Sequence, residues 1–141
     1  MLYKDAVPVI LTYGDKLSKE ELELLLYRKH ENINIIYGWS EENILHVLCH
    51  NKLVTLDMIK YIIEETDITN ENINKINFWD KENILHILCD NESVTLPIIK
   101  YIIEETDFKI ENVGQLDVCG KNAIYYLSDN KIEIKEYLLS I

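Results

Sequence analysis

The chain has 141 residues, of which 48% are hydrophobic, and a formal net charge of −11, which indicates a single compact domain. Its acidic residues are spread along the sequence, which argues against nucleic acid and anionic membranes as partners, because both bind clustered Lys and Arg. No apolar run approaches the roughly 20 residues of a membrane span, no signal peptide is recognisable, and three cysteines make no disulfide framework, so we expect a reduced, cytoplasmic protein.

The N-terminal stretch predicts two helices. The first covers about residues 2–13, where Pro8 shortens or kinks it. Ser18 and Glu21 have the spacing of a capping box, so a second helix is expected to start there, with apolar side chains on one face at Leu22, Leu25 and Leu26. We interpret residues 1–31 as an N-terminal helical cap.

A sequence repeat follows this cap. Asn43–Cys49 returns with one substitution as Asn83–Cys89, and Ile59–Asp67 returns unchanged as Ile99–Asp107. The offset is 40 residues in both cases, and a fixed period of this length is typical of stacked helical repeats, in which each unit buries its apolar face against its neighbours.

The repeat divides the rest of the chain into three units, residues 32–70, 71–110 and 111–141. In the first unit we expect an irregular start, a helix over about residues 41–50, and a second helix with Thr55 as its N-cap. The second unit repeats this arrangement, and Pro97 in the first turn of its second helix costs no hydrogen bond. The third unit is shorter, with its second helix at about 132–139. The expected inward-facing residues of the first unit are Ile44, Leu45, Leu48, Cys49, Met58, Ile59, Ile62 and Ile63.

These units resemble the ankyrin repeat, whose first helix opens with a Thr-Pro-Leu-His-x-Ala-Ala pattern after an Asp-x-x-Gly turn. Asn43–Cys49 matches the helix pattern with substitutions, and Asp117–Gly120 matches the turn, although Tyr125 stands at the position of the family's His. The period also exceeds the family's 33 residues. Such long units, rich in Ile and Asn, are similar to divergent ankyrin repeats of poxviruses and of some intracellular bacteria and protists.

The resemblance implies an all-α, ankyrin-like solenoid of one N-terminal cap and three helix-turn-helix units, forming one domain over residues 1–141. It also implies a non-enzymatic module that binds a protein through its concave and finger surface, as in a viral or pathogen protein that engages a host factor in the host cytoplasm or nucleus. The family mapping places on this surface Trp39, Ser40, Glu42, His50, Asn51, Trp79, Asp80, Glu82, Asp90, Asn91, Val118, Cys119, Lys121, Asp129 and Asn130.

This predicted surface is acidic and aromatic, and therefore suits a protein partner with a basic, partly apolar patch. Trp39 and Trp79 occupy equivalent turn positions. Trp is the residue type most enriched at binding hot spots, but an indole could equally fold back over the neighbouring unit as packing. Tyr61 and Tyr101 also repeat, and their helix face favours packing between units.

Two alternatives to this function remain open at this point. One is a zinc site, because His and Cys lie three residues apart on one helix and recur one unit later; the four residues are His46, Cys49, His86 and Cys89. In the ankyrin pattern, however, the His holds a turn by hydrogen bonding and the Cys occupies a small core position. The other alternative is self-assembly through an uncapped C-terminal edge, in which Leu138, Leu139 and Ile141 form a homodimer contact.

Enzymatic chemistry has little support in the sequence. No Ser or Cys nucleophile lies near a His in a recognised motif, and no Gly-rich phosphate loop is present. The acidic pairs Glu64–Glu65 and Glu104–Glu105 fall at helix ends on the polar side, where solvated surface is the expected role. We therefore expect no catalytic residues and no cofactor.

Overall fold

The computed structural model describes residues 16–25, 33–34 and 41–141, apart from the side chains of residues 24 and 25. Within these ranges the structure is all-helical and contains no β-strand, which confirms the predicted all-α class. The α-helices are α2 (Lys19–Leu25), α3 (Ile44–His50), α4 (Leu56–Glu65), α5 (Asn70–Ile73), α6 (Ile84–Asp90), α7 (Leu96–Glu105) and α8 (Ile132–Ser140), with 3₁₀ helices η3 (Ile110–Val113) and η4 (Ala123–Tyr126). None of these helices is long and apolar enough to cross a membrane.

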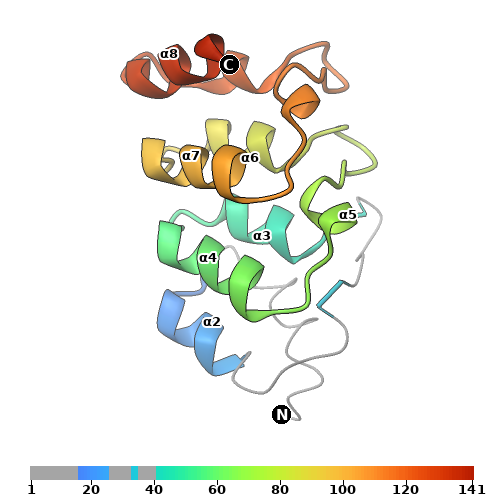
Figure 1. Cartoon of the computed structure of the whole chain (residues 1–141), viewed down its shortest axis with the longest axis vertical. Coiled ribbons are helices and arrows are strands. Elements are labelled where there is room, and N and C mark those ends of the chain that lie inside the picture. Colours follow the sequence, from blue (N-terminus) through green and yellow to red (C-terminus); the bar gives the residue numbers. More distant parts are fainter. Residues whose placement is uncertain (1–15, 26–32, 35–40) are drawn as a thin grey trace.

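The helices lie in layers that follow the chain from one end of the molecule to the other (Figure 1). Helices α2, α4, α7 and α8 form one column, in which each contacts the next. Helices α3, α6 and η4 form a second column behind it. Each unit therefore contributes one short helix to the rear column and one longer helix to the front column.

Side-chain caps decide where these helices begin. The Asn43 side chain accepts hydrogen bonds from the amides of Leu45 and His46 at the start of α3, and Asn83 caps α6 in the same way. Each cap satisfies amide groups that the first helical turn leaves without partners. Helix α3 therefore begins at Ile44 and not at the predicted residue 41. Glu41 itself has a left-handed φ of 54°, which is incompatible with a right-handed helix at that position.

The caps that the sequence predicts are confirmed. Thr55 and Thr95 accept hydrogen bonds at the start of α4 and α7, so the second helices begin where the sequence indicates. At α2, the amide of Ser18 donates to the Glu21 carboxylate at 3.1 Å, and the amide of Glu21 donates to the Ser18 hydroxyl at 3.2 Å. This is the reciprocal capping box that the sequence predicts.

The core runs through the whole stack and is built mainly from Ile and Leu. Every side chain of α3 and α6 except the last is buried, and the inward faces of α4 and α7 join them at Ile59, Ile62, Ile99 and Ile102. Each fully buried side chain of this size contributes roughly 1.5–3 kcal/mol. The predicted core is confirmed except at Ile63, which is only partly buried at the edge of the core.

The segments after the second helices differ from the expected irregular loops. Residues Asn70–Ile73 form the short helix α5, which Thr69 caps, and η3 occupies the corresponding place after α7. The helix-turn-helix pattern also predicts a first helix in the third unit, where the structure has only the 3₁₀ turn η4. Tyr125, which stands at the His position of the pattern, points to solvent, so it anchors no following turn.

Candidate functional site

The two repeated histidines are structural. His46 is fully buried; its Nδ1 accepts the amide proton of Asn43 at 3.1 Å, and its Nε2 lies 3.0 Å from the carbonyl oxygen of Lys75, to which it donates. His86 repeats this arrangement with Asn83 and with the carbonyl of Gln115. Burial lowers the pKa of His46 to about 4, so both ring nitrogens serve hydrogen bonding as a neutral imidazole.

The repeated cysteines lie in the core. Burial raises the pKa of the Cys49 thiol well above its usual range and that of Cys89 to about 12, which is the behaviour of a small apolar side chain. Among the described residues, no group of three or more His, Cys, Asp or Glu is arranged to hold a metal ion. The structure therefore places the four residues of the zinc hypothesis in packing and turn-holding positions.

The turns that precede α6 and η4 are closely tied to each other. In the first, the Asn77 amide donates to the Glu82 carbonyl and its side-chain oxygen accepts the Glu82 amide, both at 2.9 Å. The second turn closes from Asp117 to Lys121 in the same manner, at 2.8 Å. The amide of Val118 also donates to the carbonyl of Asp80 at 2.9 Å. Both turn tips are thus held in place by backbone hydrogen bonds.

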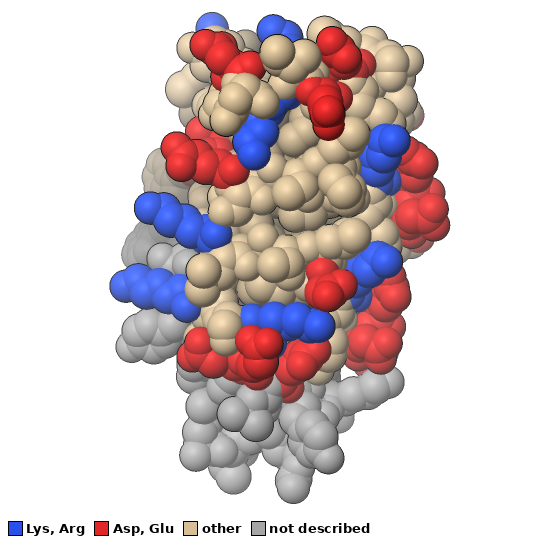
Figure 2. All heavy atoms as spheres, turned by 90° about the vertical axis from the view of Figure 1, so that its left-hand side faces the viewer, with Lys and Arg blue, Asp and Glu red and all other residues tan. Residues whose placement is uncertain are grey.

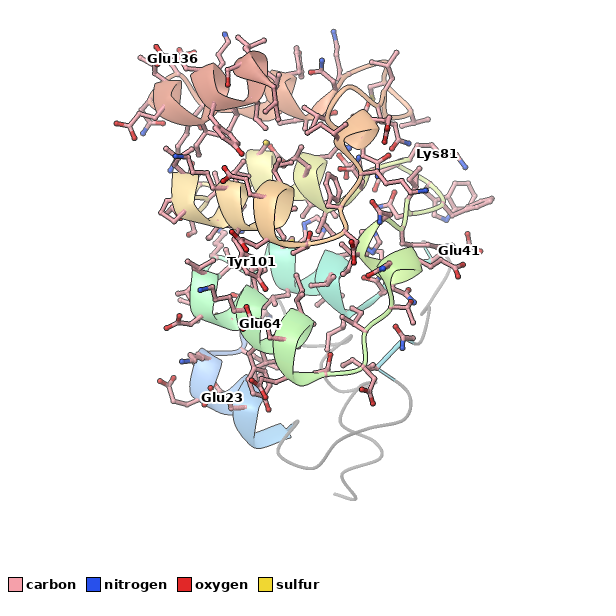
Figure 3. All side chains as sticks on the ribbon, viewed as in Figure 1. Glu23, Glu41, Glu64, Lys81, Tyr101 and Glu136 are labelled. Atoms are coloured by element: carbon pink, nitrogen blue, oxygen red, sulfur yellow. The ribbon has the colours of Figure 1, made fainter. Side chains whose placement is uncertain are left out.

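Large apolar side chains are exposed on these turns. Phe78 is 45% exposed and Trp79 is 56% exposed, and their rings meet edge to face with centroids 5.0 Å apart. Val118, on the adjoining turn, is 64% exposed. We call these three residues the aromatic tip. Lys81 lies on the same side of the molecule as Glu41, its equivalent in the preceding turn (Figure 3), and its Nζ is 4.8 Å from the centre of the Phe78 ring.

A group of acidic residues surrounds Glu82. In the preceding unit, Nε2 of His50 lies 3.5 Å from the Glu42 carboxylate, and this hydrogen bond raises the pKa of His50 and lowers that of Glu42. Burial raises the pKa of Glu82 to about 7, and the charge of Asp80 adds to this effect. The structure thus brings together five of the predicted contact residues, Glu42, His50, Asp80, Glu82 and Asp90.

Other predicted contact residues have different positions. Asn51 and Asn91 were expected on the surface, but their side chains are buried, so that prediction needs correction. Asn51 donates to the Leu17 carbonyl at 2.7 Å, and Asn91 donates to the carbonyls of Cys49 and Asn51 at 2.8 and 2.9 Å. Both amides hold successive layers together, because each satisfies backbone carbonyls of the layer before it.

Four other predicted contact residues belong to the third unit and are half-buried or exposed. Lys121 is half-buried, with its Nζ 4.4 Å from the centre of the Tyr125 ring. Cys119, Asp129 and Asn130 are exposed. Trp39 and Ser40 lie outside the described residues. Sequence reasoning missed Phe78, although an aromatic residue next to Trp79 in an expected turn was a signal that could have identified it.

A ladder of tyrosines joins the front column of helices, and the sequence interpretation recognised only part of it. The Tyr101 hydroxyl donates to Glu64 of the preceding layer at 2.7 Å, as Figure 3 allows the reader to follow. Tyr137 donates to Glu104 at 2.6 Å. The expected packing role of Tyr101 is confirmed by its burial. Glu64 and Glu104 were predicted to be solvated surface residues; they are exposed, but each also accepts a hydrogen bond from a tyrosine of the next layer. Lys60 and Lys100, four residues before Glu64 and Glu104, also approach these tyrosines. The Lys60 Nζ is 5.4 Å from the centre of the Tyr101 ring, and the Lys100 Nζ is 5.5 Å from that of Tyr137.

Removing one hydroxyl tests this ladder. We expect Tyr101→Phe to lower the free energy of unfolding by about 1 kcal/mol, because it removes a half-buried hydrogen bond to a charged group. Tyr125→Phe is the matched control, since that side chain is 62% exposed and should change stability by less than about 0.5 kcal/mol. Urea unfolding followed by circular dichroism measures both, and equal losses would contradict the proposed role of the ladder.

The face of the molecule on the left-hand side of Figure 1 carries charged side chains of both signs. Figure 2 shows Lys and acidic side chains interspersed around an uncharged central band, so neither sign of charge forms a continuous patch there. Acidic residues gather instead around Glu82, in the turn that carries the aromatic tip. The aromatic tip and the acidic residues around Glu82 are therefore the candidate site.

Comparison with known proteins is informative for the fold alone. No family model and no curated protein matches the sequence. The structure is similar to a chain in the crystal structure of the yeast ribosomal protein Rps3 in complex with its chaperone Yar1, with a TM-score of 0.69, 18% sequence identity, and coverage of 97% of this chain and 91% of that chain. At this identity the match supports the helical architecture and carries no information about individual site residues.

Proposed function

We propose that the chain is a non-enzymatic protein-binding module, a divergent ankyrin-like solenoid that binds its partner through the aromatic tip and the adjoining acidic residues. The observation that carries this proposal is the exposure of Phe78 and Trp79 on a turn that hydrogen bonds hold in place. Large aromatic side chains presented on a fixed backbone are the usual anchors of protein interfaces, because they bury much area at a small entropic cost.

The charges beside the tip define the partner's chemistry. Asp80 and Asp90 are exposed and Glu82 is half-buried, within a chain of formal net charge −11. Such a surface favours a protein with a basic, partly apolar patch, and long-range attraction would speed their association. The similar chain found in a protein complex supports protein binding in general, by analogy of fold. A viral or pathogen protein that engages a host factor in the cytoplasm is the form of this function that we propose.

Substitution of one exposed indole tests the function. We expect Trp79→Ala to weaken partner binding by at least roughly tenfold, as for a hot-spot residue, without a change in helicity. Leu139→Ala on α8 is the matched control, because Leu139 is also a large side chain, 64% exposed, and lies away from the tip. Proteins captured from lysates by the wild type and both variants are quantified by mass spectrometry, and the affinity of each candidate is then measured with purified protein. Binding that is equal for all three would contradict the proposal.

Self-assembly through α8 is the alternative with a structural observation in its favour. Leu139 and Ile141 are exposed, whereas Leu138, the third residue predicted for this contact, is buried in the core and makes no surface. If this edge forms a homodimer, light scattering will show a mass that rises with concentration and falls in Leu139→Ala. A constant monomer mass would remove this alternative.

A further inference from the structure

Equivalent positions in the first two units differ by one charge reversal. Glu42 and Glu82 each precede the N-cap of a first helix, and His50 and Asp90 each end that helix. In the first unit, His50 approaches the Glu42 carboxylate to 3.5 Å and can neutralise it. In the second unit, Asp90 stands at the position of the histidine, so the charge that acts on Glu82 from there is negative.

Nearby cations compensate this difference only in part, through the charge of His50. Among the described residues, no Lys, Arg or His forms an ion pair with Glu82 or Asp90. The two lysines of the adjoining turns approach aromatic rings, Lys81 that of Phe78 and Lys121 that of Tyr125. A half-buried carboxylate among like charges is unfavourable. Burial together with Asp80, Asp117 and Asp90 raises the pKa of Glu82 to about 7, although the charge of His50 acts in the opposite direction.

We propose that Glu82 and Asp90 receive one Lys or Arg side chain of the protein partner, in the place that His50 occupies beside Glu42, while an apolar group next to it contacts Phe78 and Trp79. This inference rests on the proposed function, because it specifies what the same surface recognises. The arrangement selects for a cation beside an apolar residue, since either group alone would leave half of the site without a complement.

A substitution within the repeat provides a sharp test. Asp90→His copies the first unit into the second and supplies the cation from within the chain, so it should weaken binding of a basic segment about tenfold. Glu82→Gln should weaken it similarly. Glu136→Gln is the matched control, because Glu136 is an exposed carboxylate on α8 that lies on the opposite side of the molecule from Lys81 (Figure 3). This variant should bind the segment with affinity within about twofold of wild type.

Random-sequence peptides displayed against the full chain are the probe. We expect peptides that bind the wild type and lose binding with Trp79→Ala to be enriched in a single Lys or Arg next to an apolar residue. These peptides should lose affinity with Asp90→His and Glu82→Gln but not with Glu136→Gln. Peptides that depend on Trp79 but show no basic preference, or that bind Asp90→His equally well, would overturn this inference and leave the proposed function intact. Bound peptides that are all insensitive to Trp79→Ala, or a wild type that enriches none, would overturn both.

The pH dependence of the selected peptides is a second arm of the same experiment. The groups that face Glu82 are Asp80, Asp90, Asp117 and His50. At lower pH, Glu82 takes up a proton and His50 gains charge, and both changes disfavour a cation. Affinity should therefore fall between about pH 8 and about pH 6, by no more than roughly tenfold per pH unit for one proton. A wild-type affinity independent of pH, or a slope unchanged in Glu82→Gln, would count against Glu82 as the group that pairs with the peptide.

Discussion

Replacing Asn83 with Ala is expected to lower the free energy of unfolding by about 3 kcal/mol. This fully buried amide accepts hydrogen bonds from the amides of Leu85 and His86 and donates to the carbonyl of Asn112 at 3.0 Å. The substitution removes the cap of α6 and leaves a buried carbonyl of the next segment without its donor. Both losses act together because one side chain serves the helix and its connection to the following segment.

Asn122 provides the control for this prediction. It holds the equivalent position in the third unit, but its side chain is only half-buried and caps η4 through a single hydrogen bond from the Tyr125 amide at 3.3 Å. We therefore expect Asn122→Ala to cost about 1 kcal/mol, a simple capping loss. Urea unfolding of both variants measures the difference. Equal destabilisation would mean that the inter-unit bonds of Asn83 contribute nothing beyond the cap.

Acidification is expected to weaken the fold through His46 by about 3 kcal/mol between pH 6.5 and pH 4. Burial lowers the pKa of this histidine to about 4 in the folded chain, against 6.5 for the ordinary value. The unfolded chain therefore binds the proton first as pH falls, so the contribution of His46 to stability is complete above pH 6.5 and is lost progressively down to about 4. His86 shifts in the same direction, because burial lowers its pKa as well.

The titration of Glu82 changes the unfolding free energy in the opposite direction. Its pKa is raised to about 7, so the stability associated with its neutral form is present at low pH and is lost as pH rises through 7.

The variant His46→Gln isolates the contribution of the histidine, since Gln can still reach back to the N-cap amide from the third helical position. The difference in unfolding free energy between wild type and His46→Gln should shrink as pH falls to 4, and a difference independent of pH would contradict a buried, neutral His46.

Local signals in the sequence predicted much of the architecture. The starts of α4, α7 and α2 follow from Thr55, Thr95 and Ser18, because a capping side chain acts within three residues of its own position. The inward faces of the helices follow from apolar spacing, and the repeat places equivalent residues in successive layers. The turn-holding histidine was expected from the ankyrin resemblance and is seen at both His46 and His86.

Contacts between layers were less predictable. Asn34 donates to the carbonyl of Asp67 and Asn74 donates to that of Asp107, each at 3.0 Å. These asparagines lie 33 residues from their acceptors, and nothing in the local sequence distinguishes them from loop asparagines. Asn51 and Asn91 were misassigned to the surface for the same reason, since a polar residue after a helix is buried only when a neighbouring layer offers carbonyls to it.

For the candidate site, the sequence by itself determined which residue types recur, and the ankyrin resemblance predicted that Trp79, Glu82 and Asp90 share one surface. Tertiary structure decided the rest. It placed Phe78 beside Trp79 in the open, tied their turn to the next through Val118, and left Glu82 without the counter-ion that Glu42 has. Local signals act over a few residues and survive in the sequence pattern, whereas exposure and charge pairing depend on which groups the stacking of layers brings within a few ångströms.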